Sequence, residues 1–240
     1  MSWLKSNDMV PSRYFLIARL MPAIVCSVPF FVLYFFFLSY PLGDFFKTLL
    51  SVPWLGDVTT GIAFIFLLAF VGRSISKDIF ERRWFKSDET RMPTTNFLMH
   101  DNSEYSIDFK RLVHEKIKTD FTLEIFPAHE ESRNEAGARK RIAEAVLLVR
   151  QRVKNGRLVL NHNIEYGFFR NLIGCSVIAV LVSTLNIWIF HAVQPNPLAL
   201  NTSIVLFILY LIPIATAKLM MDVHGRRYAR VLIQEYLTIQ

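Results

Sequence analysis

Four long runs without a charged side chain constrain the fold of this 240-residue chain most strongly. They cover residues 20–43, 58–72, 171–190 and 192–217. A helix needs about 20 apolar residues to cross about 30 Å of hydrocarbon, and three of the runs reach that length. Buried helices of soluble proteins rarely stay uncharged for so long. The sequence therefore predicts an all-α membrane protein.

The runs predict four transmembrane helices, arranged as two hairpins that flank a mainly helical cytoplasmic domain. The expected spans are residues 20–40, 57–73, 171–191 and 199–218. They divide the chain into an N-terminal tail and hairpin (1–73), a cytoplasmic domain (74–170), a C-terminal hairpin (171–218) and a cytoplasmic tail (219–240). The first span contains Pro22 and Pro29, so we expect a kink and backbone carbonyls that neighbouring helices must satisfy.

The distribution of lysine and arginine predicts the orientation. Nineteen of the 27 lie in residues 73–170, three precede the first run and four follow the last. The two short connections contain one and none. Because basic residues collect on the cytoplasmic side, both termini and the middle are predicted to be cytoplasmic. The expected location is a bacterial inner membrane, with a multi-pass topology.

Charge also argues against two classes of protein. The formal net charge is +7, but residues 73–170 contain fifteen acidic residues beside their nineteen basic ones. This excess is much weaker than the basic stripe of a nucleic-acid binder, so nucleic acid is not a predicted partner. Basic residues beside the spans favour anionic lipid headgroups instead. None of the runs contains a carboxylate, which argues against an ion-coupled transporter.

The sequence lacks the motifs of common catalytic and cofactor sites. It has no Walker A loop, dinucleotide fingerprint, HExxH helix, GxSxG elbow or Cys-x-x-Cys pair. We therefore predict no enzyme activity, no cofactor and no metal site. One alternative stays open, because His162 and Glu165 are spaced to share a helix face. Together with Arg170, they would form the site of an interfacial enzyme.

Residues 132–155 are predicted to form a helix that carries a binding surface. Ser132 and Glu135 fit a capping box at its start, and Gly156 fits its end. Its apolar face consists of Ile142, Val146, Val149 and Val153. Beside this face lie Arg139, Arg150 and Lys154. These cations form either a solvated flank or a groove for an anionic ligand or lipid headgroup.

Hydrogen-bonding side chains are concentrated just before the third run. We expect residues 157–170 to form a polar hinge, whereas residues 74–86 continue the second span as a helical stalk. The residues predicted to bind a ligand or partner here are His162, Glu165, Tyr166, Arg170 and Asn171. Ser183, Thr184 and Asn186 are the candidates for lining a pore. Four helices enclose no sizeable channel, so a pore requires a homo-oligomer.

Two short stretches resemble segments of uncharacterised bacterial multi-span inner-membrane proteins. They are Pro93-Thr94-Thr95 with Leu98, and the stretch from Ile164 to Asn171, which includes the letters YGFFRN. The resemblance covers about a tenth of the chain. It implies that the two stretches form one cytoplasmic site near the membrane.

These observations favour two functions. The first is an oligomeric membrane sensor or effector whose cytoplasmic domain receives a ligand or partner and alters the membrane. Small effectors of anti-phage defence have this layout, and the analogy is one of architecture alone. The second is a scaffold subunit that recruits a soluble cytosolic protein to the membrane.

Overall fold

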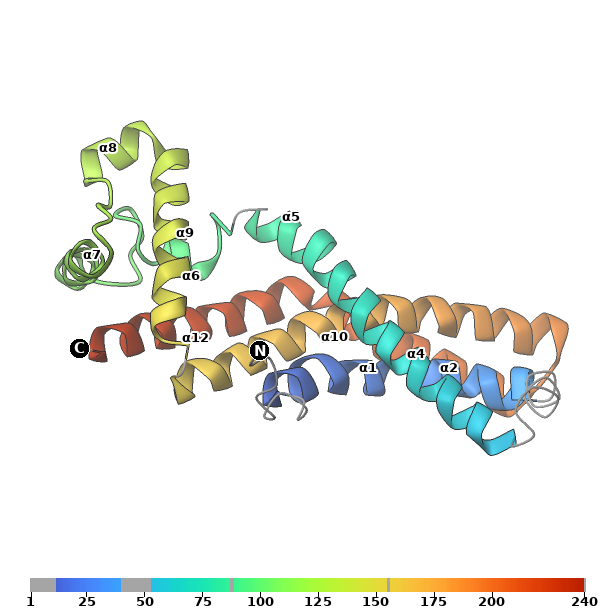
Figure 1. Cartoon of the computed structure of the whole chain (residues 1–240). Coiled ribbons are helices and arrows are strands. Elements are labelled where there is room, and N and C mark those ends of the chain that lie inside the picture. Colours follow the sequence, from blue (N-terminus) through green and yellow to red (C-terminus); the bar gives the residue numbers. More distant parts are fainter. Residues whose placement is uncertain (1–11, 40–52, 87–88, 155, 240) are drawn as a thin grey trace, which may run out of the picture. The chain divides into compact units, whose positions relative to one another are not determined.

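The computed structural model describes residues 12–39, 53–86, 89–154 and 156–239. Every regular element among these residues is a helix (Figure 1). In chain order they are η1 (Phe15–Leu20), α1 (Met21–Cys26), α2 (Val28–Leu33), η2 (Tyr34–Leu38), α4 (Pro53–Ile75), η3 (Ser76–Glu81), α5 (Arg82–Phe85), α6 (Pro93–Asn96), α7 (Ile107–Phe121), α8 (Ala128–Arg133), α9 (Glu135–Arg152), α10 (Arg157–Trp188), η4 (Ile189–Val193), α11 (Pro197–Ala215) and α12 (Ala217–Thr238), where η marks a π-helical segment.

Four helical stretches are long and apolar enough to cross a membrane. They are Phe15–Leu38, Val58–Phe85, Arg157–Val193 and Pro197–Ala215. The predicted all-helical fold with four helices able to span a membrane is thus confirmed for the described residues, and it is consistent with a multi-pass membrane protein. The second and third stretches extend well beyond the predicted spans, because their helices continue into flanking polar residues. The second stretch contains 28 residues and includes the predicted stalk.

Residues 157–170 do not form the predicted polar hinge. They are the first turns of α10, which continues as one helix to Trp188 (Figure 1). Polar side chains do not prevent this, because a helix satisfies its backbone groups internally whatever its side chains are. The start of α10 also receives a cap from α12, where Glu235 Oε2 accepts the backbone N–H of Val159 at 3.0 Å.

The chain divides into two compact units. The first, here called the span unit, consists of residues 1–77 and 167–217. The second, called the polar unit, consists of residues 78–166 and 218–240.

The span unit has a core of small and aromatic side chains at the crossings of its helices. Its buried members are Ala23, Cys26, Leu68, Ala69, Cys175, Ala179 and Tyr210. Within this unit α4 packs against η1 and α1, and α11 packs against α2 and η4. Gly174 of α10 lies so close to α4 that an added Cβ would overlap the carbonyl oxygen of Gly72. Glycine is therefore required where these two backbones meet.

The two prolines of the first span leave carbonyls that other helices satisfy, as predicted. Pro22 and Pro29 have no N–H, so the carbonyls four residues earlier lose their usual helical donor. Asn171 Nδ2 of α10 donates to the Ala18 carbonyl at 2.6 Å. The Tyr210 hydroxyl of α11 donates to the Val25 carbonyl at 2.5 Å. Both bonds join the first span to another helix.

Asn171 is the centre of a buried polar cluster in the span unit. Its side chain is 1% exposed, and Ser76 Oγ of η3 lies 3.4 Å from its Oδ1 atom. The same hydroxyl lies 3.0 Å from the carbonyl oxygen of Arg73. One amide therefore links segments of three of the candidate spans, through its own N–H group and through the Ser76 hydroxyl.

The polar unit is held together by α7, α9 and α12. The predicted apolar face of α9 is confirmed, since Ile142, Val146, Val149 and Val153 are all buried. They share one core with residues of α7 and α12, among them Val113, Ile117, Leu232 and Tyr236. α7 begins after Ser106, whose Oγ accepts the Phe109 N–H at 3.2 Å.

A buried polar network fixes the loop between α6 and α7. Lys110 is 2% exposed, and its Nζ donates to the carbonyls of Met99 and His100 at 2.9 Å and of Asn102 at 2.5 Å. Glu131 is 4% exposed and accepts the backbone N–H of His100 at 2.8 Å. Each buried charge is thus stabilised by backbone dipoles. The network thereby also holds α6, whose last residue, Asn96, contacts Arg139 of α9.

His114 belongs to the same network. Its Nε2 atom lies 2.9 Å from the Leu98 carbonyl oxygen. The pKa of His114 is lowered to about 4, chiefly by burial and to a smaller extent by the nearby His100 and Lys110, against the opposing effect of that hydrogen bond. The ring is therefore neutral at neutral pH and donates its Nε2 proton to the carbonyl.

Asn171→Leu should destabilise the protein, because the Ala18 carbonyl would keep neither its helical donor nor its side-chain donor. We expect a loss of about 1–3 kcal/mol, towards the lower end for a bond between membrane helices. Unfolding by sodium dodecyl sulfate in mixed micelles measures this change.

Thr184→Val is the matched control. Thr184 is exposed, and its one side-chain hydrogen bond to a described residue is to the Val180 carbonyl of its own helix, at 2.9 Å. This variant should unfold at nearly the same detergent concentration as the wild type. Equal stability of Asn171→Leu and Thr184→Val would show that the freed carbonyl does not matter.

Candidate functional site

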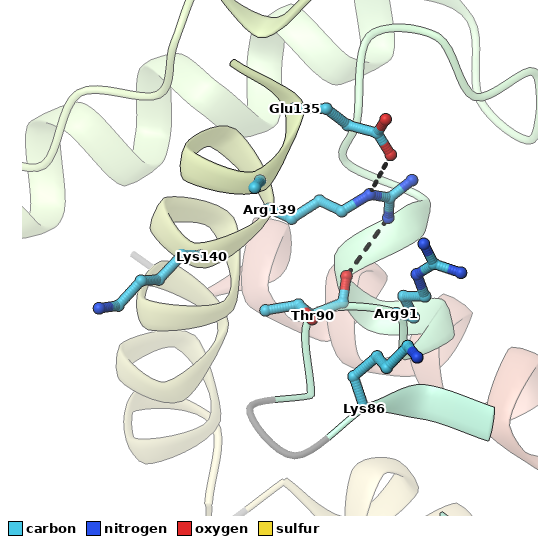
Figure 2. Close-up of a pocket in the computed structure, with 7 residues that line it drawn as sticks. Lys86, Thr90, Arg91, Glu135, Arg139 and Lys140 are labelled. Carbon is cyan, nitrogen blue, oxygen red and sulfur yellow. Dashed lines mark hydrogen bonds and ion pairs between the residues drawn. The ribbon is translucent and has the colours of Figure 1, made fainter. Parts of the chain in front are cut away.

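A cavity of about 400 Å³ lies in the polar unit between the segment after α5 and the first two turns of α9. Its lining consists of Lys86, Thr90, Arg91, Glu135, Ala136, Arg139 and Lys140 (Figure 2). Four of these side chains are cationic and one is anionic. The cavity, called the basic pocket from here on, therefore has an excess of positive charge.

One wall of the basic pocket is formed by the residues that come immediately after the helix of the second candidate span in the chain. That helix ends at Phe85, and Lys86 is the next residue. Lys86 and Glu89 have positive φ angles of 63° and 57°. For residues other than glycine such backbones cost about 1–3 kcal/mol and persist only where the surroundings hold them. Here the N–H of Arg91 donates to the Phe85 carbonyl at 3.1 Å.

Arg139 of α9 ties the two walls together. Its Nε donates to Glu135 Oε1 at 2.6 Å, one helical turn earlier. Its Nη1 donates to Asn96 Oδ1 at 2.5 Å and to the Thr90 carbonyl at 3.3 Å. The side chain is only 17% exposed. Arg139 therefore positions the Thr90 wall against α9, and most of its donors are already occupied.

Arg150 forms a second tie, further along α9. Its Nη1 donates to Glu89 Oε2 at 2.5 Å, and its Nη2 lies 3.4 Å from Thr94 Oγ1. Its guanidinium carbon also stands 5.8 Å from the centre of the Tyr228 ring, a cation–π distance. The bond to Glu89 holds one of the two residues of this pocket wall that have positive φ. Arg150 is thus a support of the basic pocket and does not line it.

The start of α9 differs from the sequence prediction. Ser132 lies inside α8, where its hydroxyl donates to the His129 carbonyl at 3.0 Å, so the predicted capping box is wrong. Asn134 is the N-cap, and its Oδ1 accepts the Gly137 N–H at 3.0 Å. Glu135 opens α9, and its hydrogen bond to Arg139 lowers its pKa. The positive end of an 18-residue helix therefore faces the pocket lining.

Three cations of the basic pocket form no ion pair within 4.0 Å among the described residues, although Arg91 is near enough to Glu135 to help lower the pKa of that carboxyl. They are Lys86, Arg91 and Lys140, and all three are exposed. Figure 2 shows Lys86 and Arg91 on the same side of α9 as the Arg139 guanidinium, whereas the Lys140 side chain points the other way. The positive field is therefore strongest around Lys86 and Arg91, with Lys140 at the rim.

The predicted binding residues are distributed over several places. Among the described residues only Arg139 of this set lines the basic pocket. Lys154 follows the far end of α9 and is exposed. His162 Nδ1 and Glu165 Oε2 lie 3.1 Å apart on α10, and Tyr166 is buried on the same helix.

Two further predicted binding residues, Arg170 and Asn171, belong to the span unit. The predicted pore residues lie in this unit as well. Ser183 and Asn186 are fully buried there, and Asn186 Nδ2 donates to the Pro29 carbonyl at 2.7 Å. Thr184 is exposed on the surface of the unit.

Sequence reasoning missed most of the pocket lining. Lys86, Thr90 and Arg91 meet Glu135 and Lys140 across more than forty residues of chain. No periodicity joins an irregular segment to a helix so far away. The one usable signal was the end of the stalk before Pro93, which marks an irregular segment rich in polar side chains.

Neither metal clusters nor known relatives add to this site. Within the described ranges, no group of three or more His, Cys, Asp and Glu side chains could hold a metal ion. No family model matches the chain, and neither the curated proteins nor the solved structures contain a significant match.

Arg139→Gln should loosen the wall of the basic pocket without touching its free cations. The Thr90 carbonyl and the Asn96 amide would lose their shared donor, so residues 89–96 should open more often. Hydrogen–deuterium exchange of the full-length protein in detergent measures this opening. We expect exchange of the Arg91 and Met92 amides to be about tenfold faster.

Arg152→Gln is the control, because this exposed arginine lies at the other end of the same helix. Its exchange pattern at residues 89–96 should match that of the wild type. Unchanged exchange in Arg139→Gln would mean that Arg139 does not hold the segment.

Proposed function

We propose that this protein is an oligomeric, multi-pass sensor or effector of a bacterial inner membrane, whose polar unit faces the cytoplasm and binds an anionic ligand in the basic pocket. The observation that carries the proposal is the cluster of three cations, none of them in an ion pair with a described carboxylate, in a cavity of about 400 Å³. Sites for small molecules commonly measure about 300–1,000 Å³.

The position of Lys86 suggests how binding acts on the membrane. This residue directly follows Phe85, the last residue of the 28-residue helix that starts at Val58. An anion that draws Lys86 and Arg91 towards α9 changes the preferred position of that helix end. A ligand shifts a conformational equilibrium only by binding one state more tightly, and a charge-lined cavity that closes around an anion provides such a difference.

The orientation follows from charge. Nineteen of the 27 lysine and arginine residues lie in residues 73–170, and four more follow the last run, which supports a cytoplasmic position for the middle and both termini. We propose that several copies assemble and alter the bilayer, because four helices enclose no sizeable channel. A role in anti-phage defence is proposed by analogy of layout.

A scaffold that recruits a cytosolic protein is the second candidate. It is favoured by large apolar side chains on the polar unit, since Ile107 and Leu112 of α7 are 77% and 53% exposed. Stoichiometric co-purification of one soluble protein would distinguish it, if Ile107→Ser abolished that capture and Lys86→Ala did not.

The double variant Lys86→Ala with Arg91→Ala tests the proposed function. Expression of the wild type in bacterial cells should depolarise the membrane, as followed with a potential-sensitive dye. The double variant should lose most of this effect, because it keeps the fold but lacks the two central cations of the pocket.

Arg152→Ala provides the control, since it removes an exposed cation outside the basic pocket and should depolarise like the wild type. Membrane fractionation must show equal insertion of all three proteins. A wild type that leaves the potential intact, or a double variant as active as the wild type, would contradict the proposal.

A further inference from the structure

We infer that the ligand of the basic pocket is a small soluble molecule that carries a diphosphate or two neighbouring phosphate groups. This inference rests on the proposed function and names the chemistry of its ligand. The first argument is charge. Glu135 offsets one of the four lining cations, so the described lining has three positive charges in excess.

The excess matches two phosphate groups better than one small anion. Each phosphate monoester carries about −1.5 to −2 charge at neutral pH. Two of them together neutralise three cations, whereas a single carboxylate leaves two cations uncompensated. A carboxylate already occupies Arg139, because Glu135 lies 2.6 Å from its Nε.

The free donors also suit phosphate oxygens. Arg91 presents a planar guanidinium, which binds two oxygens at once, and Lys86 contributes a compact charge beside it (Figure 2). The first turn of α9 adds backbone N–H groups that lack a helical acceptor. Arg139 acts as a positioning residue, because its fork is occupied by Glu135, Asn96 and Thr90.

The lining selects for the phosphates more than for the rest of the molecule. None of the described residues that line the pocket is aromatic. A nucleobase would therefore find no ring to stack on, and recognition depends on charge and on the reach of Lys86 and Arg91. Lys140, whose side chain points to the other side of α9, adds positive charge at the rim.

Phosphate groups come either from soluble molecules or from lipid headgroups, and chain length favours the soluble source. Arg73 is the first charged residue after the second apolar run, and Lys86 follows thirteen positions later in the chain. A helix rises about 1.5 Å per residue, so this stretch extends about 20 Å. The headgroup layer on each side of a bilayer is only about 5–8 Å thick.

Binding of inorganic pyrophosphate to the full-length protein in detergent tests the inference. Isothermal titration calorimetry at constant ionic strength should show one saturable site per chain. Pyrophosphate should bind at least about tenfold more tightly than phosphate or sulfate. Removing both Lys86 and Arg91 should weaken it by about tenfold or more, and Lys140→Ala by less, since Lys140 lies at the rim.

Two controls separate a site from general charge attraction. Arg152→Ala should bind pyrophosphate as the wild type does, and Lys86→Arg should retain most of the affinity because it keeps the charge. Equal affinity for pyrophosphate and sulfate would overturn the inference, as would binding that ignores the loss of Lys86 and Arg91. Thermal melting verifies that the variants are folded.

A lipid arm distinguishes the two sources. Nanodiscs that contain cardiolipin, which has two phosphates, should leave the affinity for pyrophosphate unchanged relative to nanodiscs of neutral lipid. Competition by cardiolipin would overturn the soluble source. If depolarisation depends on Lys86 and Arg91 but pyrophosphate does not bind, the ligand class fails while the proposed function stands. If pyrophosphate binds through Lys86 and Arg91 but depolarisation does not depend on them, the phosphate site stands and the proposed function fails.

Discussion

A backbone carbonyl that lacks a donor is costly in hydrocarbon, and this constraint organises the span unit. Pro22 and Pro29 remove two helical donors from the first span. Asn171 and Tyr210 replace them, each from a different helix. These bonds fix which helices must be neighbours, while Gly174 permits α10 and α4 to approach at backbone distance. Polar groups thus specify a packing that apolar side chains, equally soluble in lipid, do not specify.

The polar unit uses charges in another way. Lys110 and Glu131 are buried and satisfied by backbone groups, which holds the loop after α6. Arg139 and Arg150 then bind the segment between α5 and α6 to α9. These bonds offset the unfavourable backbone energy of the positive φ angles at Lys86 and Glu89. With these arginines occupied, the remaining cations of the basic pocket form no ion pair within 4.0 Å in the described part of the chain, and the lining keeps an excess of positive charge. Rigid walls with unpaired charges are what an anion site requires.

The coarse fold could be predicted from the sequence because its signals are local. Run lengths predict the four long helices, and apolar periodicity predicts the buried face of α9. The hinge expected at residues 157–170 was wrong, since polarity alone does not break a helix. The prediction of a capping box at Ser132 was wrong because Ser132 already lies inside a short helix, for which Pro127 is the N-cap. Most of the basic pocket could not be predicted from the sequence, because it forms where an irregular segment meets a helix that begins more than forty residues later.

The central claim is that the polar unit, with its basic pocket, faces the cytoplasm while four helices hold it to the membrane. Labelling of a single cysteine at Glu104→Cys with a membrane-impermeant maleimide tests this most directly, because the native Cys26 and Cys175 are buried. The position should be protected in intact cells and labelled in inverted membrane vesicles. Labelling in intact cells would reverse the orientation and contradict the account of a cytoplasmic ligand.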